Sequence, residues 1–181
     1  MEVFKSDQAR QLEQFKAQQA GQLETAKAES AKVIELLKNQ LSRESVALEK
    51  LSEAVAEVAR RLAAGRHSIC WLCWIAKYCP KDLTADHLTA YDKEMNEIWS
   101  QLVRARVVLA ALSAPVHTQL SPLIQKLYDL DVKVGDAKAL YSESNERGIK
   151  ALGSLHQATQ IFDDELLNTV TSLSQFGSAR T

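Results

Sequence analysis

The sequence predicts an all-α fold: an elongated antiparallel helical bundle or coiled coil with two long and two shorter helices. Glycine and proline, which interrupt helices, number only 6 and 3 in 181 residues. Alanine, leucine, glutamate, lysine, glutamine and arginine, the better helix formers, dominate the chain. Apolar residues recur every three or four positions over most of its length, which is the spacing of an amphipathic helix. We expect residues 1–181 to form a single helical domain.

A first long helix is predicted over residues 7–64, with Ser6 as its N-cap. It contains no proline, and Gly21 is its only glycine. Its second half, residues 34–62, carries a heptad row of apolar residues, interrupted only by Glu44. The members of this row are Ile34, Leu37, Leu41, Leu48, Leu51, Val55, Val58 and Leu62. The earlier half has a thinner row with an eleven-residue period, so we expect residues 34–62 to be the more deeply buried part.

A short helix rich in cysteine and aromatic residues is predicted over residues 66–79, between Gly65 and Pro80. Glycine is a natural residue just after the end of a helix, and proline cannot continue one. The alternative is a helix that runs straight through Gly65 to Pro80, because the heptad spacing continues across the glycine. We prefer the break because it permits an up-down-up-down path for four helices.

A third helix is predicted over residues 84–113, with Thr84 as N-cap and Leu83 and Leu88 as a hydrophobic staple. Its apolar row is widened by Trp99, Val103, Val107 and Val108. This width predicts contact with two neighbouring helices rather than one.

A second long helix is predicted over residues 121–176, opened by Ser121-Pro122, with a frayed tail at 178–181. Each long helix would span about 85 Å. Their similar lengths favour an antiparallel hairpin, with the two shorter helices completing a four-helix head. In such a hairpin residues 7–30 would pack against 150–176. Two helices alone leave their apolar rows half exposed, so we expect a homodimer that covers them.

A metal centre is one hypothesis for the densest group of reactive side chains. His67, Cys70 and Cys73 have the spacing of metal ligands, and Cys79 or His87 could complete a set of four. However, these positions spread around a helix, and cysteine is also a common small buried residue. We therefore expect no cofactor, and a metal or redox bundle that uses Cys70, Cys73 and Cys79 remains an alternative.

Trp71, Trp74 and Tyr78 form a second apolar row on the same short helix. Large aromatic side chains are typical anchors of protein interfaces, so these three are the candidate interaction residues. Burial in the core and insertion of this tip into a membrane are the alternatives.

Several functional classes find no support in the sequence. A net charge of −1, from 22 basic and 23 acidic residues, argues against nucleic-acid binding. Residues 1–22 lack the apolar segment of a signal peptide, and the remaining apolar stretches do not suit a membrane span, so membrane contact is not expected. Three cysteines do not suggest a disulfide framework and favour a reducing, cytoplasmic location. The glycine-rich nucleotide-binding motifs, the zinc-protease motif and the Glu-x-x-His pairs of di-iron bundles are all absent, so we do not expect an enzyme.

These observations favour a non-enzymatic helical scaffold or protein–protein interaction module that associates with itself and with an unknown protein partner. One alternative is a ligand-sensing or membrane-tethered four-helix bundle domain of a larger protein.

Overall fold

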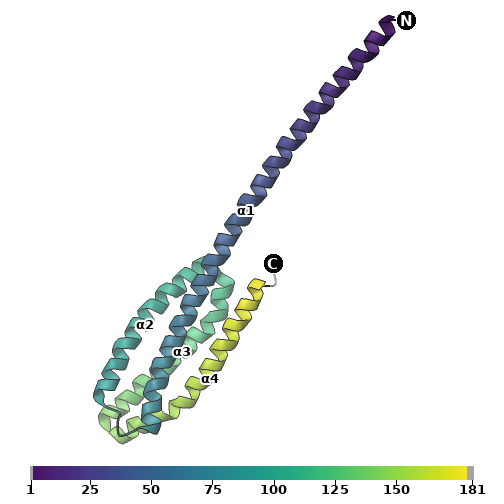
Figure 1. The fold of residues 1–181 in the computed structure, drawn as a ribbon. Helices are drawn as coiled ribbons and strands as arrows, with labels where there is room; N and C mark the ends of the chain where they lie inside the picture. The colour runs from purple at the N-terminus through teal and green to yellow at the C-terminus, as the bar shows by residue number, and fades with distance from the viewer. Residues whose placement is uncertain (1, 179–181) are drawn as a thin grey trace. The chain divides into compact units, whose positions relative to one another are not determined.

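A computed structural model describes the backbone of residues 2–178, and the side chains of residues 29–173 together with 21, 24 and 27. Within these residues it contains four α-helices and no β-strand: α1 (Glu2–Tyr78), α2 (Ala85–Leu112), α3 (Ala114–Glu143) and α4 (Asn145–Ser178) (Figure 1). The all-α class and the helical bundle are therefore confirmed. The chain divides into two compact units, Met1–Glu49 and Lys50–Thr181.

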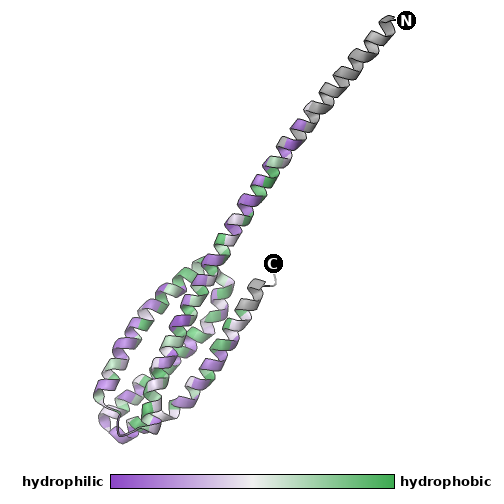
Figure 2. Cartoon of the chain, in the orientation of Figure 1, coloured by the Kyte–Doolittle hydropathy of each residue, from purple (hydrophilic) through white to green (hydrophobic). Residues whose placement is uncertain are grey.

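The second unit is a four-helix bundle made of the C-terminal part of α1 together with α2, α3 and α4, which lie side by side (Figure 1). Apolar and polar residues alternate along each of these helices (Figure 2), as expected of helices that bury one face. All four helices contribute to one core. Its most deeply buried members include Val58, Leu62, Ile69, Leu72, Leu102, Leu109, Leu120, Leu127, Val134 and Leu152. Burial of each such side chain stabilises the bundle by about 1.5–3 kcal/mol.

The predicted break between helices 7–64 and 66–79 is wrong, because α1 continues through Gly65 to Tyr78. Gly65 is buried, and a Cβ atom added to it would lie 2.8 Å from Cδ2 of Leu127. The backbone of Gly65 does not adopt a positive φ angle. The glycine therefore provides room for a side chain of α3 and does not terminate the helix.

The start of α2 confirms the predicted cap at Thr84. The Thr84 amide donates a hydrogen bond to Nδ1 of His87, 3.3 Å away. Leu83 and Leu88 are both buried, as a hydrophobic staple requires.

The predicted contact of this helix with two neighbours is observed, because Glu94 of α2 accepts a hydrogen bond from Ser68 of α1 and Trp99 of α2 donates one to Asp131 of α3. However, the side chains of Val103, Val107 and Val108 are exposed and do not widen the buried face.

The predicted helix 121–176 is wrong at both ends of α3. Ser113 alone separates α2 from α3, and its hydroxyl accepts a hydrogen bond from the Val116 amide at 3.4 Å. Pro115 lies in the first turn of α3, where its missing amide hydrogen costs nothing, and Pro122 lies inside the helix. Residues 114–120, predicted as a linker, are helical for this reason.

Ser144 is the second one-residue link, and it ends α3 and precedes α4. The Gly148 amide donates to the Ser144 carbonyl oxygen at 3.0 Å, and a Cβ atom at Gly148 would lie 2.3 Å from Cα of Tyr141. A glycine at this position lets the chain reverse against its own backbone. The predicted helix 121–176 continued through Ser144 and Gly148, which only interrupted its apolar row.

For the predicted hairpin of residues 7–30 against 150–176, the side chains of residues 7–30 lie largely outside the described residues. Phe162 and Leu166, the expected partners of residues 7–30, are buried in the core of the four-helix bundle. The side chains of residues 7–20 lie outside the described part of the chain, as does the predicted tail from residue 179 onward.

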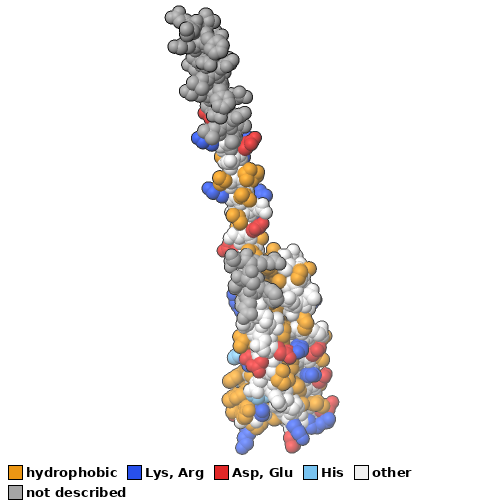
Figure 3. Space-filling view, turned by 90° about the vertical axis from the view of Figure 1, so that its right-hand side faces the viewer, with side chains coloured by type: hydrophobic (Ala, Val, Ile, Leu, Met, Phe, Trp, Pro, Cys, Tyr) orange, Lys and Arg blue, Asp and Glu red, His pale blue; other side chains and the backbone are white. Residues whose placement is uncertain are grey.

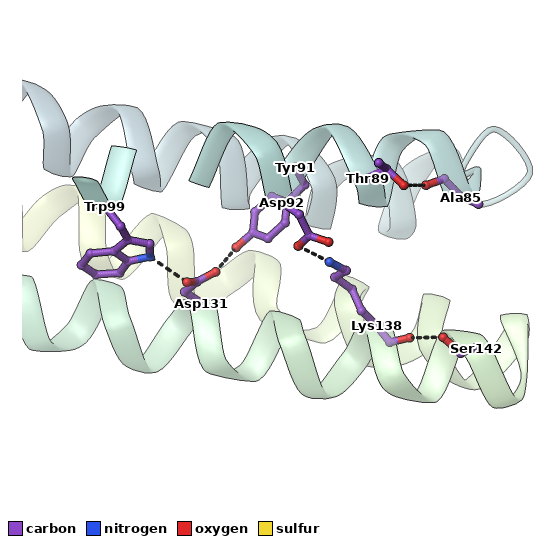
Figure 4. A network of polar contacts seen from close by, with 8 residues as sticks. All are labelled: Ala85, Thr89, Tyr91, Asp92, Trp99, Asp131, Lys138 and Ser142. Atoms are coloured by element: carbon purple, nitrogen blue, oxygen red, sulfur yellow. Dashed lines mark hydrogen bonds and ion pairs between the residues drawn. The ribbon is translucent and has the colours of Figure 1, made fainter. Parts of the chain in front are cut away.

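A carboxylate joins α2 to α3 (Figure 4). Asp131 accepts hydrogen bonds from the Tyr91 hydroxyl at 2.6 Å and from Nε1 of Trp99 at 2.7 Å. Two turns further along α3, Lys138 forms an ion pair with Asp92. Tyr91 is buried, and this burial, followed by the hydrogen bond to Asp131, raises the pKa of its hydroxyl well above the ordinary value. The phenol therefore remains a hydrogen-bond donor throughout the physiological range.

We expect Asp131→Ala to lower the free energy of unfolding by about 1–3 kcal/mol, because two aromatic donors lose their acceptor. Urea unfolding followed by circular dichroism measures this change. Asp129→Ala is the matched control, since Asp129 is exposed and accepts only from Gln125 on its own helix. Equal losses in the two variants would contradict the role of Asp131.

We expect Gly148→Ala to destabilise the bundle by about 1–3 kcal/mol, because the added methyl group meets backbone atoms of α3 that cannot move aside. Gly135→Ala is the control: Gly135 is exposed within α3, and nothing lies within 4 Å of the position that a methyl group would occupy there. Since alanine favours the helix, this control should gain about 0.5–1 kcal/mol. Thermal and urea unfolding compare the two variants.

Candidate functional site

An exposed apolar row follows α1 over residues 33–48 of the first unit (Figure 3). It includes all four heptad residues predicted there, at 53% exposure for Ile34 and Leu37, 65% for Leu41 and 59% for Leu48. The prediction that this half of the row is buried is wrong, whereas Val58 and Leu62 further along are buried as expected. Helix α1 has 77 residues, and α2, α3 and α4 have 28, 30 and 34. Within the first unit, α1 is the only helix that the structure describes.

The positions beside this row carry few charges. In the heptad register set by Ile34 and Leu37, the flanking positions hold Val33, Lys38, Gln40, Ser45 and Ala47. Lys38 is the only charged residue among them. The edges of the exposed row are therefore apolar or neutral except at Lys38.

An exposed aromatic face lies on α1 in the second unit, and it consists of Trp71, Trp74 and Tyr78. Their exposed fractions are 54%, 38% and 55%, so the alternative that they are buried in the core is wrong. The indole rings of Trp71 and Trp74 are stacked, with centroids 5.5 Å apart and planes 8° apart. The centroid of the Tyr78 ring lies 5.9 Å from that of Trp74. It also lies 5.6 Å from the centroid of the His156 ring, and the planes of these two rings are perpendicular.

His156 and Cys70 meet where α4 packs beside this face. Nδ1 of His156 lies 3.9 Å from Sγ of Cys70. Burial, and then the positive charges of Lys77 and Arg66, lower the pKa of His156 below its ordinary value. The sequence did not point to His156, because only the packing of α4 on α1 brings it to residues 86 positions away.

The proposed metal ligands do not form a site in the described residues, where no group of three or more His, Cys, Asp or Glu side chains could hold a metal ion. His67 is exposed, Cys70 and Cys79 are half-buried, and Cys73 is buried. Burial raises the pKa of the Cys73 thiol to about 12, whereas metal binding requires a thiolate. The hypothesis of a metal or redox centre therefore lacks an assembled ligand set in this part of the chain.

Two shallow depressions lie on the bundle. One, of about 460 Å³, lies between α2 and α3, and its charged residues Asp92 and Lys138 already neutralise each other. The other, of about 300 Å³, lies between α1 and α2 near Ala54 and Val108. The residues that line these depressions include no cysteine or histidine. The hydroxyls of Thr89 and Ser142 at the first depression donate to carbonyl oxygens of their own helices, at 3.1 and 3.2 Å.

Comparison of the chain with protein-family models, with curated proteins and with solved structures finds no match. Among the described helices, none combines the length and the apolar character needed to cross a lipid bilayer. The exposed row of residues 33–48 and the aromatic face are therefore the two features that bear on function.

We expect the stability of the bundle to fall as the pH decreases from 7 to about 5.5, in part because of His156. The pKa of the folded His156 is lowered, so the unfolded chain takes up a proton near pH 6.5 that the folded chain resists. The free energy of unfolding should therefore decrease with pH in this window, and His156→Gln should reduce that slope. Urea unfolding at pH 8, 7, 6 and 5.5 measures the slopes, and equal slopes in both proteins would contradict the assignment.

Proposed function

We propose that this protein is a non-enzymatic helical scaffold or interaction module that forms a homodimer through the exposed row of residues 33–48. The observation that carries this proposal is the 53–65% exposure of Ile34, Leu37, Leu41 and Leu48 on one face of α1. Soluble proteins seldom leave a contiguous row of large apolar side chains in water. The row has the heptad spacing by which helices interlock side chains in a coiled coil.

A second copy of the chain suits this row for two reasons. First, an identical helix brings the same heptad spacing, so the apolar residues of both helices can stay in contact along the row except at Glu44, which interrupts it. Second, Lys38 is the only charged residue at the flanking positions, so identical edges meet with little like-charge repulsion. A symmetric dimer is also the simplest closed assembly.

A reducing compartment such as the cytoplasm fits this proposal. All three cysteines are free thiols, although Cys70 and Cys73 are only one helical turn apart. Proteins in oxidising compartments more often pair their cysteines.

The test is the mass of the full chain by multi-angle light scattering at micromolar concentration. The wild-type protein should have the mass of two chains of 20.1 kDa. The double variant Leu37→Glu, Leu41→Glu should have the mass of one, because two charges at the centre of an apolar interface prevent its burial. Circular dichroism should show that the helical content of the bundle is retained.

Val46→Glu is the matched control. Val46 is also an exposed apolar residue of α1, at 46%, but it lies on the side of the helix opposite the row. This variant should remain dimeric. A monomeric wild-type protein, or equal dissociation by the control and the double variant, would overturn the proposed dimer.

A further inference from the structure

We infer that the aromatic face of Trp71, Trp74 and Tyr78 binds an acidic amphipathic helix of a partner protein. This face lies in the second unit and shares no residue with the row proposed to mediate self-association, so the inference does not depend on that proposal.

The three rings have the spacing by which one helix presents anchors to another. They occupy positions i, i+3 and i+7, which place them on one side of α1 over two turns. Large aromatic residues contribute disproportionately to protein interfaces. Figure 3 shows hydrophobic side chains gathered toward the lower end of the bundle, which indicates that this end carries apolar surface on its outside.

The rings are also ordered before any partner binds. Trp71 is held by the stack with Trp74, and Tyr78 is held between Trp74 and the buried His156. Side chains that are already fixed lose less conformational entropy on association. The observed arrangement is therefore suited to binding, since all three residues remain exposed while the orientation of their rings is set by neighbours.

The segment of α1 that carries the face is basic. Helix α1 and the loop after it contain no aspartate or glutamate from residue 58 to residue 81. Arg60 and Arg61 pair with Glu57, and Arg66 pairs with Asp163 at 2.9 Å. Lys77 and Lys81 are exposed, and neither forms an ion pair with another described residue.

These two lysines favour a partner that carries negative charge beside its apolar row. Nζ of Lys77 lies 5.1 Å from the centre of the Tyr78 ring, at the edge of the aromatic face. A helix that covers the rings with an apolar row and places carboxylates along its edges would meet Lys77, and Lys81 follows Tyr78 by three residues. Complementary charge of this kind raises the association rate and selects among partners.

Two other occupants fit less well. A second copy would place the same basic segment of α1 against itself, with like charges opposed. An anionic lipid surface would attract the lysines, but Glu94 of α2, which is exposed and accepts a hydrogen bond from Ser68 of α1, carries the opposite charge to the lysines. A protein can vary its charge from residue to residue, whereas a bilayer surface presents one charge throughout.

The test uses a fluorescein-labelled synthetic helix of about five turns, with leucine at i, i+3 and i+7 and glutamate at the flanking positions. Fluorescence anisotropy with the full chain should show binding that weakens as NaCl rises from about 0.05 to 0.5 M. The matched peptide with lysine in place of glutamate should bind at least ~10-fold more weakly, because it opposes Lys77 and Lys81.

Variants of the protein locate the site. Trp71→Ala and Lys77→Glu should each weaken binding of the acidic peptide by ~10-fold or more, with unchanged circular dichroism since both side chains are exposed. Tyr128→Ala is the control, because Tyr128 is an aromatic residue of α3 with 53% exposure outside this face. The dimer-disrupting variant Leu37→Glu, Leu41→Glu should still bind the peptide, which separates this inference from the proposed function.

Four results would overturn the inference. The first is no binding of the acidic peptide, and the second is equal binding of the acidic and the lysine peptide. The third is a fall in the molecular mass of the protein caused by Trp71→Ala. The fourth is stronger binding of the protein to vesicles than to the acidic peptide. The vesicles are a mixture of phosphatidylcholine and phosphatidylserine, about three to one, assayed by sedimentation with the wild-type protein and with Trp71→Ala. Loss of vesicle binding in this variant would assign the face to a lipid surface, and the fall in mass would assign it to a second copy.

Discussion

The one-residue links at Ser113 and Ser144 constrain the bundle more than any other feature. A link of one extended residue spans only a short distance. The next helix must therefore start beside the end of the previous one and return along it. These two reversals place α2, α3 and α4 together as consecutive neighbours, and the C-terminal part of α1 supplies the fourth wall of the core. The close approach at Gly148 follows from the second reversal, and the Asp131 bridge lies where the first reversal brings α2 and α3 together.

Periodicity was a reliable guide to helix type and a poor guide to helix ends. The all-α class, the helix at 84–113 and the cap at Thr84 all follow from local sequence, because capping and amphipathic spacing act within a few residues. Gly65 and Ser144 misled for opposite reasons. The glycine is required by Leu127, more than 60 positions later, and the serine ends a helix without any proline or positive-φ glycine to mark the turn. Neither effect is visible in a window of sequence around the residue.

The candidate surfaces show the same division between local and distant effects. The sequence singled out Trp71, Trp74 and Tyr78, because their helical spacing sets them apart from the core-facing row of α1. It could not provide His156, which reaches Cys70 and Tyr78 only through the packing of α4 on α1. For Ile34 to Leu48 the heptad pattern was correct but its burial was not, since a heptad specifies that a helix needs a partner without specifying which chain provides it.

The buried thiol of Cys73 has a practical consequence. Its side chain is fully enclosed by the core, and it stays protonated at neutral pH because its pKa is about 12, so a water-soluble alkylating reagent cannot attack it in the closed bundle. Cys70 and Cys79, which are half-buried, remain open to the same reagent. The rate at which Cys73 is alkylated in the native protein should therefore report the transient opening of the four helices. Mass spectrometry of the unmodified sequence can follow this rate without any engineered label.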